Sequence, residues 1–490
     1  MKRWFKWLFI SLGVLAALIV IFYLEENWRG AREWAKVSAE LKARGYPLTV
    51  KETIPPPIPD EDNVAAAPIF AELFDANGGE NKEARLAKAV PFKTTPKILP
   101  VFIRGEIGDL RFYFEQGEFT MTEQEAAHKI LAELDKEWMP LLAEIAEALK
   151  CPQCRWPLAY EKGFAMRMPQ VDACLKISKV LTLRAICRLE LGQSKEAVDD
   201  LVTIFHLAQV TEKYPQSISV LSSLMERGLA IDVFWNGCVR KQWKQEDLNR
   251  LQSLFADIDN LKPQKRTSLI DCGYFLSMQP MAKKELRNIK SSTSLINSGS
   301  IEAGFLGKIL VLIWKIRPHG WEDLDCCVYL KYIMSAEELI DEPSARIDIL
   351  KAKQLVVDMN ARFSCGNTRT AAMTPLSSLF VSSLVIPMIT CARIETQSKI
   401  GELSCALERY RLANGEVPDK LEALMPRYLD KLPVQVVNGE PFIYRKVGAR
   451  DYMLYSVGWD LKDDGGKWSK SREKGDWVWA SKPELYQELQ

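Results

Sequence analysis

The hydrophobic pattern is strongest at the start of the chain, where an uncharged run extends from Trp7 to Leu24. Leu, Ile, Val, Phe and Ala dominate these 18 residues. As a helix rising 1.5 Å per residue, the run is about 27 Å long, which with its flanks matches a hydrocarbon core of roughly 30 Å. Aromatic rings suited to a membrane interface lie near both ends, at Trp4, Trp7, Tyr23 and Trp28. Residues 1–24 are therefore predicted to form a transmembrane anchor.

A cleaved signal peptide is the alternative, since a basic start followed by an apolar stretch is typical of both. The chain continues after Leu24 as Glu-Glu-Asn-Trp, without the small residues of a cleavage site, so retention of the helix is predicted. Lys2, Arg3 and Lys6 precede the run and favour a cytoplasmic N-terminus. We therefore expect a single-pass protein of the inner (cytoplasmic) membrane with a periplasmic or otherwise extracytoplasmic body.

Residues 25–62 are predicted to be an amphipathic helix followed by a spacer. Trp28, Ala31, Trp34, Val37 and Leu41 recur at spacings of three and four residues, which is typical of one helix face. This helix is expected to end at the sequence Gly-Tyr-Pro of residues 45–47. Four prolines among residues 54–59 predict an extended polyproline segment, because each fixes its own φ and disfavours helix in the preceding residue. This segment would be a stiff spacer between anchor and body.

Residues 63–370 are predicted to form a mostly helical domain. Helical periodicity covers about 122–150 and is strong from 171 to 258, while the sequence Asn-Gly-Gly of residues 77–79 indicates a loop. Two apolar stripes, separated by a turn at residues 191–194, predict an antiparallel helix pair. Their members are Cys174, Ile177, Leu181, Ala185 and Leu189, then Ala197, Leu201, Phe205 and Ala208. The pair resembles a tetratricopeptide (TPR) hairpin, but three copies at a period of 34 are not found, so a plain helical bundle is the alternative.

Two further apolar stretches need comparison with the anchor. Residues 301–316 include Glu302, Lys308 and Lys315, which favours a buried or surface helix. Residues 371–392 carry no charge but contain two prolines and four serines. Inserting these residues into lipid costs free energy, which favours a core helix over a second membrane span.

Residues 371–490 are predicted to form a small α+β module. A long helix through Leu403–Asn414 ends at Gly415, and a short helix follows around Leu421. Alternating patterns at 441–444, 452–458 and 476–479 predict three strands, the first two joined by a turn at 447–451. The whole chain is thus expected to be mainly α: an N-terminal transmembrane helix, a helical-hairpin body (TPR-like or bundle) and a small C-terminal α+β module with a three-stranded antiparallel sheet.

The order of these C-terminal signals is specific. Tyr410 is followed by Gly415 and Pro418, a Leu-Pro pair stands at 432–433, a Pro-x-x-Tyr strand at 441–444 and a Ser-x-Gly-x-Asp loop at 456–460. This order resembles the C-terminal half of type II secretion pseudopilins, over roughly the last 100 residues. The chain as a whole also resembles uncharacterised membrane-anchored proteins of planctomycete and verrucomicrobial bacteria.

Two departures from the pseudopilin pattern bear on function. The Gly-aromatic processing site and the Glu five positions into the apolar helix are missing, so a processed filament subunit is not expected. Gln435 and Val436 stand where pseudopilins usually carry Asp-Pro after the Leu-Pro element, which puts the contact of that carboxylate in doubt.

The pseudopilin resemblance also implies a calcium loop. Asp460, Asp463 and Asp464 lie within five residues next to two glycines, and Asp476 could return to them from the third strand. Ca²⁺ takes six to eight oxygen ligands from such flexible loops. The spacing departs from the EF-hand pattern, so a solvated acidic turn is the alternative to a Ca²⁺ site.

Charge and motifs exclude several classes of function. Lys and Arg number 65 against 64 Asp and Glu, so a nucleic-acid partner is not expected. No phosphate loop, dinucleotide turn or serine-hydrolase elbow is present. The only histidines, His128, His206 and His319, lack metal-binding spacing, and His206 is interpreted as a core or interface residue. The sequence therefore contains no motif that identifies a catalytic residue, and it suggests no cofactor beyond Ca²⁺.

The cysteines give one motif, Cys151-Pro-Gln-Cys154, which follows a predicted helix instead of opening one. We interpret it as a loop disulfide or two ordinary thiols, since a zinc ribbon would need a second pair and the adjacent Cys326 and Cys327 do not provide it. The other cysteines of helical runs (Cys174, Cys187, Cys391 and Cys405) are read as small buried hydrophobic residues.

The sequence therefore predicts a membrane-anchored extracytoplasmic binding or assembly protein with an envelope protein as its partner and without a recognisable catalytic motif. An envelope hydrolase that works with two carboxylates is the first alternative, with Glu322, Asp323 and Asp325 as candidates, although these are also typical of a solvated charge cluster. A purely structural envelope protein is the second.

Overall fold

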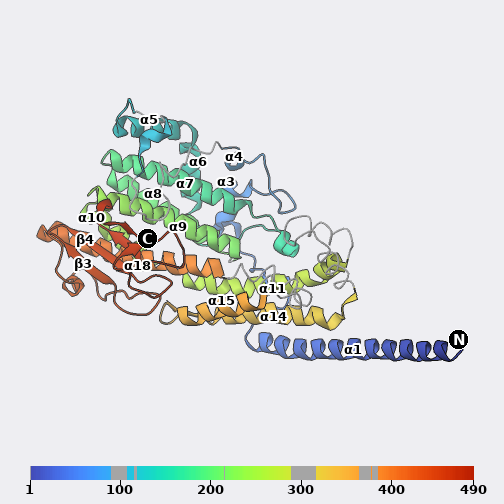
Figure 1. Cartoon of the computed structure of the whole chain (residues 1–490). Coiled ribbons are helices and arrows are strands. Elements are labelled where there is room, and N and C mark those ends of the chain that lie inside the picture. Colours follow the sequence, from blue (N-terminus) through green and yellow to red (C-terminus); the bar gives the residue numbers. More distant parts are fainter. Residues whose placement is uncertain are drawn as a thin grey trace. The chain divides into compact units, whose positions relative to one another are not determined.

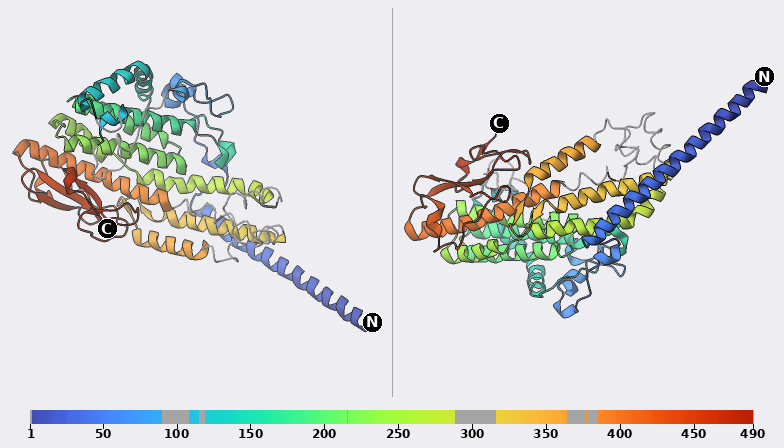
Figure 2. Two further views of the ribbon diagram at one scale, coloured as in Figure 1. Left: turned by 45° about the horizontal axis from the view of Figure 1, so that its top comes forward. Right: turned by 90° about the horizontal axis from the view of Figure 1, so that it is seen from below.

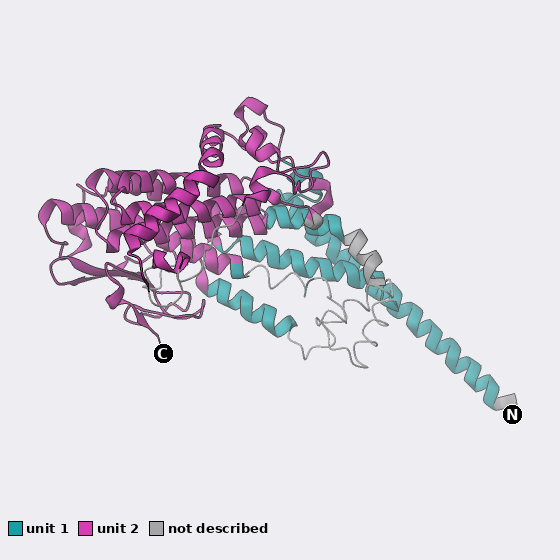
Figure 3. Ribbon diagram, turned by 90° about the horizontal axis from the view of Figure 1, so that it is seen from above, with its two compact units in different colours: residues 1–54, 268–339, 350–386 teal, residues 55–267, 340–349, 387–490 magenta. Residues whose placement is uncertain are grey.

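The computed structural model describes residues 2–89, 108–114, 119–214, 216–287, 316–363, 377 and 385–489 (Figure 1). The fold is mainly α with a small antiparallel sheet near the C-terminus, as predicted. The chain divides into two compact units, coloured in Figure 3. Unit 1 comprises residues 1–54, 268–339 and 350–386, and unit 2 comprises residues 55–267, 340–349 and 387–490. Residues 63–370, expected to form one helical domain, thus contribute to both units.

Unit 1 is built from helices that come from distant parts of the chain. They are α1 (Lys2–Ala43), α2 (Val50–Thr53), α11 (Leu261–Arg287, from residue 268 on), α14 (His319–Glu337) and α15 (Ile349–Phe363, from residue 350 on). The apolar stretches at 301–316 and 371–392 lie largely outside the described residues. A buried or surface helix at 301–316 and a core helix at 371–392 therefore stay predictions.

Helix α1 joins the predicted anchor and the predicted amphipathic helix into one element of 42 residues. It ends where the sequence predicted, because Gly45 adopts a left-handed φ of 75° and Pro47 follows. The first half presents large apolar side chains on all sides: Trp4 is 74% exposed and Leu24 65%. In both views of Figure 2 this half extends away from the other helices of unit 1.

The second half of α1 packs against α14. Its buried positions are Glu26, Gly30, Val37 and Leu41. The predicted amphipathic face was therefore wrong at Trp28 and Ala31, which are exposed. The reason is steric: Gly30 has no side chain and lets the backbone of α14 come close, so the contact face is rotated toward the glycine.

The contact between α1 and α14 is backbone on backbone. A Cβ atom on Gly30 would overlap the main chain of Gly320, and one on Gly320 would overlap the carbonyl oxygen of Glu26. Polar groups are paired across this contact: the Trp321 indole N–H donates to Glu26 Oε2 at 2.7 Å, and the Gly320 N–H donates to Asn27 Oδ1 at 2.9 Å. The two helices are thus fixed in register by main-chain contact and by directed hydrogen bonds.

Ion pairs and aromatic contacts extend the α1–α14 contact in both directions. Lys331 Nζ lies 2.6 Å from a Glu33 oxygen, and Arg44 pairs with Glu338. Toward the apolar half, Phe22 packs edge-on against Trp321 with ring centroids 6.2 Å apart. The second half of α1 is therefore part of the folded body of unit 1.

The proline segment is extended at both of its ends, with φ and ψ of −71° and 123° at Ile54 and −58° and 144° at Pro59. It was expected to separate anchor from body. In the structure the body already begins in α1, and the chain passes from unit 1 to unit 2 at Ile54 and Pro55.

Unit 2 has a helical core. Its longer helices are α5 (Glu123–Glu137), α6 (Met139–Ala148), α7 (Pro169–Glu190), α8 (Ser194–Thr211), α9 (Ser217–Val239), α10 (Gln245–Ala256) and α18 (Val385–Asn414, from residue 387 on). Short α3 (Pro68–Ala71) and α4 (Arg85–Lys88) precede them. All nine residues of the two predicted apolar stripes are buried. Helix α9 packs on both α7 and α8, so the predicted pair is part of a larger cluster of helices.

The C-terminal module contains the predicted sheet. Strands β3 (Ile443–Val447), β4 (Asp451–Ser456) and β6 (Trp477–Ala480) pair antiparallel in the order β3-β4-β6, and Val447 faces Asp451 at the predicted turn. Two smaller pairs add to unit 2: β1 (Ile340–Asp341) with β2 (Arg346–Ile347), and β5 (Lys467–Trp468) with β7 (Gln487–Glu488). The Trp235 indole of α9 donates to the Ala480 carbonyl at 2.9 Å, which ties β6 to the helical core.

Gln435, the residue that departs from the pseudopilin pattern, holds this module together. Its side-chain oxygen accepts from the Ser456 hydroxyl at 2.8 Å and from the Val457 N–H at 3.0 Å, and its amide donates to the Pro441 carbonyl at 2.7 Å. Because the side chain is buried, an amide suits the position: a carboxylate could not donate to the carbonyl.

Replacing Gly320 by Val tests the α1–α14 contact. The new side chain must separate two backbones, and overpacking of this kind costs about 1–3 kcal/mol or more. We expect the Gly320→Val protein in detergent micelles to melt several degrees below the wild type. Gly13→Ala is the matched control, since nothing lies within 4 Å of a Cβ there. Equal melting temperatures for Gly320→Val and wild type would contradict the contact.

Candidate functional site

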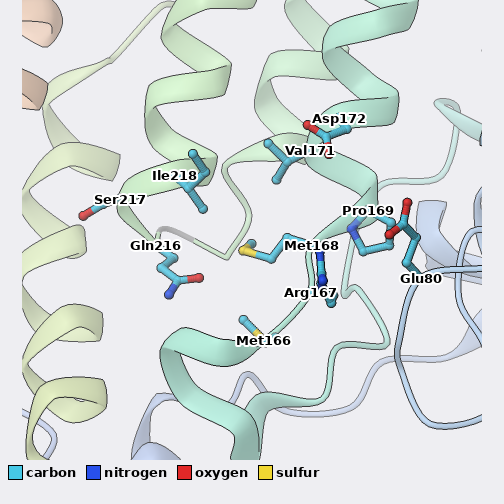
Figure 4. Close-up of a pocket in the computed structure, with 10 residues that line it drawn as sticks. All are labelled: Glu80, Met166, Arg167, Met168, Pro169, Val171, Asp172, Gln216, Ser217 and Ile218. Carbon is cyan, nitrogen blue, oxygen red and sulfur yellow. The ribbon is translucent and has the colours of Figure 1, made fainter. Parts of the chain in front are cut away.

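The first candidate site is a pocket of about 370 Å³ in unit 2, where α7 and α9 begin (Figure 4). We call it the methionine pocket. Met166 and Met168 line it with Pro169, Val171 and Ile218, and polar groups come from Glu80, Arg167, Asp172, Gln216 and Ser217. Ile218 is 55% exposed although it is large and apolar. Neither helix has a side-chain cap at its start, which falls on Met168 and Gln216.

Methionine side chains suit a site that adapts to its ligand. The thioether is polarizable and has several rotatable bonds, so Met-lined surfaces accept apolar groups of different shape. The pocket volume lies at the small end of the range for ligand sites. The arrangement can therefore take up an apolar side chain of a partner, with Glu80, Arg167 and Asp172 available for polar contacts.

A buried polar network crosses the helical core of unit 2. Arg227 of α9 donates from both terminal nitrogens to the two oxygens of Glu212 at 2.6 Å, and from Nη1 to Asn260 at 3.0 Å. Asn260 in turn donates from its side chain to Glu395 of α18 at 2.8 Å. The network thus links α8, α9, the start of α11 and α18 by charge-assisted hydrogen bonds.

Glu226 lies beside this network and is completely buried. The Thr211 and Ser222 hydroxyls donate to it at 3.2 and 3.3 Å. Burial disfavours the charged carboxylate and raises the pKa of Glu226 to about 8, although these hydrogen bonds act in the other direction. Glu226 is therefore protonated at neutral pH.

Sequence reasoning missed Glu226 and Arg227. A signal was present, because Ser219, Ser222 and Ser223 precede them at helical spacing within an otherwise apolar helix. Such a polar stripe indicates that the helix has a polar neighbour, but it does not identify that neighbour.

The four aspartates of the predicted calcium loop lie in the C-terminal module. Asp476 returns to the loop as predicted: its Oδ2 accepts the N–H groups of Asp464 at 3.1 Å and Gly466 at 2.7 Å. Asp463 accepts from the Tyr455 hydroxyl at 3.1 Å, and Asp460 accepts from the Lys462 N–H at 3.3 Å. Burial is the main cause that raises the pKa of Asp476, to about 6.

These contacts make the acidic loop a turn held by backbone N–H groups. Within the described part of the chain, no group of three or more His, Cys, Asp or Glu side chains is arranged to hold a metal ion. The calcium site at Asp460, Asp463, Asp464 and Asp476 stays a prediction of the resemblance.

The candidate carboxylates of a hydrolase lie in and around α14 of unit 1. Glu322 and Asp325 are buried, so the interpretation as a solvated cluster was wrong for these two. The reason is pairing: Arg317 Nη2 lies 3.7 Å from Glu322, and Asp325 accepts the Ser377 N–H at 2.9 Å. Asp323 is half-buried, and none of the three lines the methionine pocket.

The histidines and cysteines are also placed. His206 was interpreted as a core or interface residue. It is exposed on α8, so the core alternative was wrong: it follows Phe205 on the helix and points away from the apolar stripe. The ten described cysteines are free thiols, eight of them buried, including all four that were interpreted as hydrophobic residues. Cys151 and Cys154 are therefore two thiols and not a disulfide, and burial raises the pKa of Cys154 to about 12.

The chain matches no protein-family model, no curated protein and no solved structure.

The pKa of Glu226 predicts a dependence of stability on pH. Its ordinary pKa is 4.5, so between about pH 4.5 and 8 the folded protein binds a proton that the unfolded chain has lost. The free energy of unfolding should then fall as pH rises through this window, by at most about 5 kcal/mol. We expect Glu226→Gln, which stays neutral, to flatten this curve when urea unfolding is measured from pH 5 to 8.

Glu196→Gln is the control for Glu226→Gln, because Glu196 is an exposed carboxylate on the neighbouring helix α8. It should leave the curve unchanged. A pH dependence that is the same in the Glu226→Gln protein and the wild type would show that Glu226 is ionised in the fold.

Proposed function

We propose that the protein is a single-pass, membrane-anchored binding protein whose body recognises an envelope protein outside the cytoplasm. One observation carries this proposal: the first half of α1 is apolar, is as long as a bilayer core is thick, and is exposed at every position from 4 to 22. Of the described helices it is the one that is long and apolar enough to cross a membrane. A face of this kind is stable in lipid and costly in water.

Retention of the helix, as opposed to cleavage of a signal sequence, is supported by its continuity. α1 runs without a break from Lys2 to Ala43, and its last apolar residues already contact α14. The hydroxyl of Tyr23 donates to the Ile316 carbonyl, and Phe22 packs on Trp321. Cleavage near residue 25 would remove these contacts from a folded unit.

An extracytoplasmic body is supported by the N-terminal cations, following the positive-inside rule. The many cysteines do not oppose this orientation. Buried thiols are inert, because burial raises their pKa and solvent oxidants cannot reach them, as for Cys174, Cys238 and Cys405. A body of this kind tolerates an oxidising compartment without disulfides.

The binding role is supported by the methionine pocket and by the antiparallel helix pair beside it, which we propose to act in the manner of a TPR hairpin. The pseudopilin-like order of elements in the last 100 residues supports a role in assembly at the membrane. The carboxylate hydrolase is less well supported, because Glu322 and Asp325 are buried and hydrogen bonded or ion paired within unit 1.

A charge in the middle of the apolar half tests the anchor. Leu15→Arg should make insertion less favourable by about 2.5–3.5 kcal/mol for the arginine alone. We expect the wild type to stay in the membrane pellet after carbonate extraction and Leu15→Arg to appear largely in the supernatant. Leu412→Arg, a change at an exposed leucine of unit 2, is the control and should stay in the pellet. Carbonate extraction of the wild type itself would overturn the anchor.

Topology is tested separately. Mass spectrometry of the membrane protein should show an N-terminus ahead of residue 24, and a C-terminal alkaline phosphatase fusion should be active, because that enzyme folds only in an oxidising compartment. A mature chain that begins near residue 25 would identify a signal peptide. An inactive phosphatase fusion together with an active cytoplasmic reporter would place the body inside the cell.

A further inference from the structure

A second pocket in unit 2 has a different chemistry from the methionine pocket. It has a volume of about 400 Å³ and lies between the end of α8 and the connection from α10 to α11. Its cationic lining residues are Lys213, Arg227, Lys262 and Arg266, and its anionic ones are Glu212, Asp257 and Asp259. We call it the charged pocket.

Arg227 is the buried donor of the charged pocket, with a side chain only 4% exposed. Its two terminal nitrogens face Glu212, and Nη1 also donates to Asn260 and weakly to Ser223. A guanidinium has five N–H donors. The Nε–H and the second N–H of Nη2 are not used by any described residue, and these two donors form one edge of the planar group. This edge has the spacing of a carboxylate or phosphate oxygen pair.

Glu212 and Asn260 keep this edge in place. The paired contact with Glu212 fixes the plane of the guanidinium, and Asn260 is itself held by Glu395. A donor that is already oriented loses little conformational entropy when a ligand binds. Arg227 is therefore preorganised.

The remaining charges favour a ligand with a single negative charge. Lys213, Lys262 and Arg266 are exposed and form no ion pair with any described residue. Asp259 accepts the N–H groups of Leu261 and Lys262, and Asp257 is exposed nearby. The charge of Glu212 is neutralised by Arg227. The remaining three cations and two carboxylates leave the pocket with one excess positive charge. A doubly charged phosphate would be repelled by Asp257 and Asp259 more strongly than a carboxylate.

We propose that the charged pocket binds the carboxylate group of a small ligand, with the free edge of Arg227 as the bidentate donor and Lys213, Lys262 and Arg266 as the attracting charges. The ligand is a small organic acid or the C-terminus of a peptide, since both present the same group. This site depends only on contacts within unit 2, so it stands or falls independently of the membrane anchor.

Calorimetry on the full-length protein in detergent micelles tests the proposal. The probes are propionate, trialanine with a free carboxylate, trialanine amide and inorganic phosphate. We expect saturable binding of propionate or of free trialanine, none of the amide, and weaker binding at high salt. Binding of trialanine alone identifies a peptide end, and binding of propionate alone identifies an organic acid. No binding of either carboxylate, or tighter binding of phosphate, would overturn the proposal.

Variants locate the site. The double change Lys262→Ala and Arg266→Ala removes two exposed cations without touching the core and should weaken binding about tenfold or more. Arg227→Lys keeps the charge but loses the donor edge, and we expect a similar or larger loss. Lys195→Ala removes an exposed cation elsewhere on α8 and should change nothing.

Thermal melting shows whether Arg227→Lys is folded; if it is not, the double variant alone decides. Equal affinities of the double variant, Lys195→Ala and the wild type would place the ligand elsewhere and refute the site.

Discussion

Gly30 of α1 and Gly320 of α14 bring two helix backbones into direct contact, and unit 1 is arranged around this contact. Helix axes normally stay 8–10 Å apart because side chains keep them there. Without side chains at the contact, main-chain groups and short polar side chains come within hydrogen-bonding range, as between Gly320 and Asn27. The same contact fixes the direction in which the apolar half of α1 leaves the helices of unit 1.

This arrangement changes how an anchor of this kind would act. A membrane segment followed by a flexible tether leaves its body free to reorient. Here one continuous helix includes both the apolar half and a half that is packed into unit 1, with ion pairs from Glu33 and Arg44 to α14. If the apolar half spans the membrane as proposed, unit 1 would be held at a fixed orientation next to the bilayer.

Unit 2 follows a different principle, since its core contains charges. Isolated buried charges are costly, and they persist only when they are paired and hydrogen bonded. Arg227 meets this condition through Glu212 and Asn260, while Glu226 avoids the cost by remaining protonated and neutral. The described residues leave two N–H donors of Arg227 unused, and Arg227 lines a pocket. The C-terminal module uses neutral groups for the same purpose: the Gln435 amide joins two loops that a carboxylate could not join.

Local patterns in the sequence predicted the elements well. The run from Trp7 to Leu24, the stripes of α7 and α8 and the turn between β3 and β4 are properties of neighbouring residues, and helix and strand periodicity express them directly. The return of Asp476 to the acidic loop could also be predicted, because strand pairing brings it back.

Long-range contacts decided what the patterns left open. Trp28 and Ala31 have the spacing of a buried face, but both are exposed. The buried face of α1 instead includes Gly30, because Gly30 is in backbone contact with Gly320, almost 300 residues away. Glu322 and Asp325 look like solvated acids until Arg317 and Ser377 are placed beside them. The sequence by itself determined which segments are helical, which are strands and which half of α1 is apolar. The tertiary structure decided which charges are buried and which groups pair with them, because burial and pairing depend on neighbours that only folding brings together.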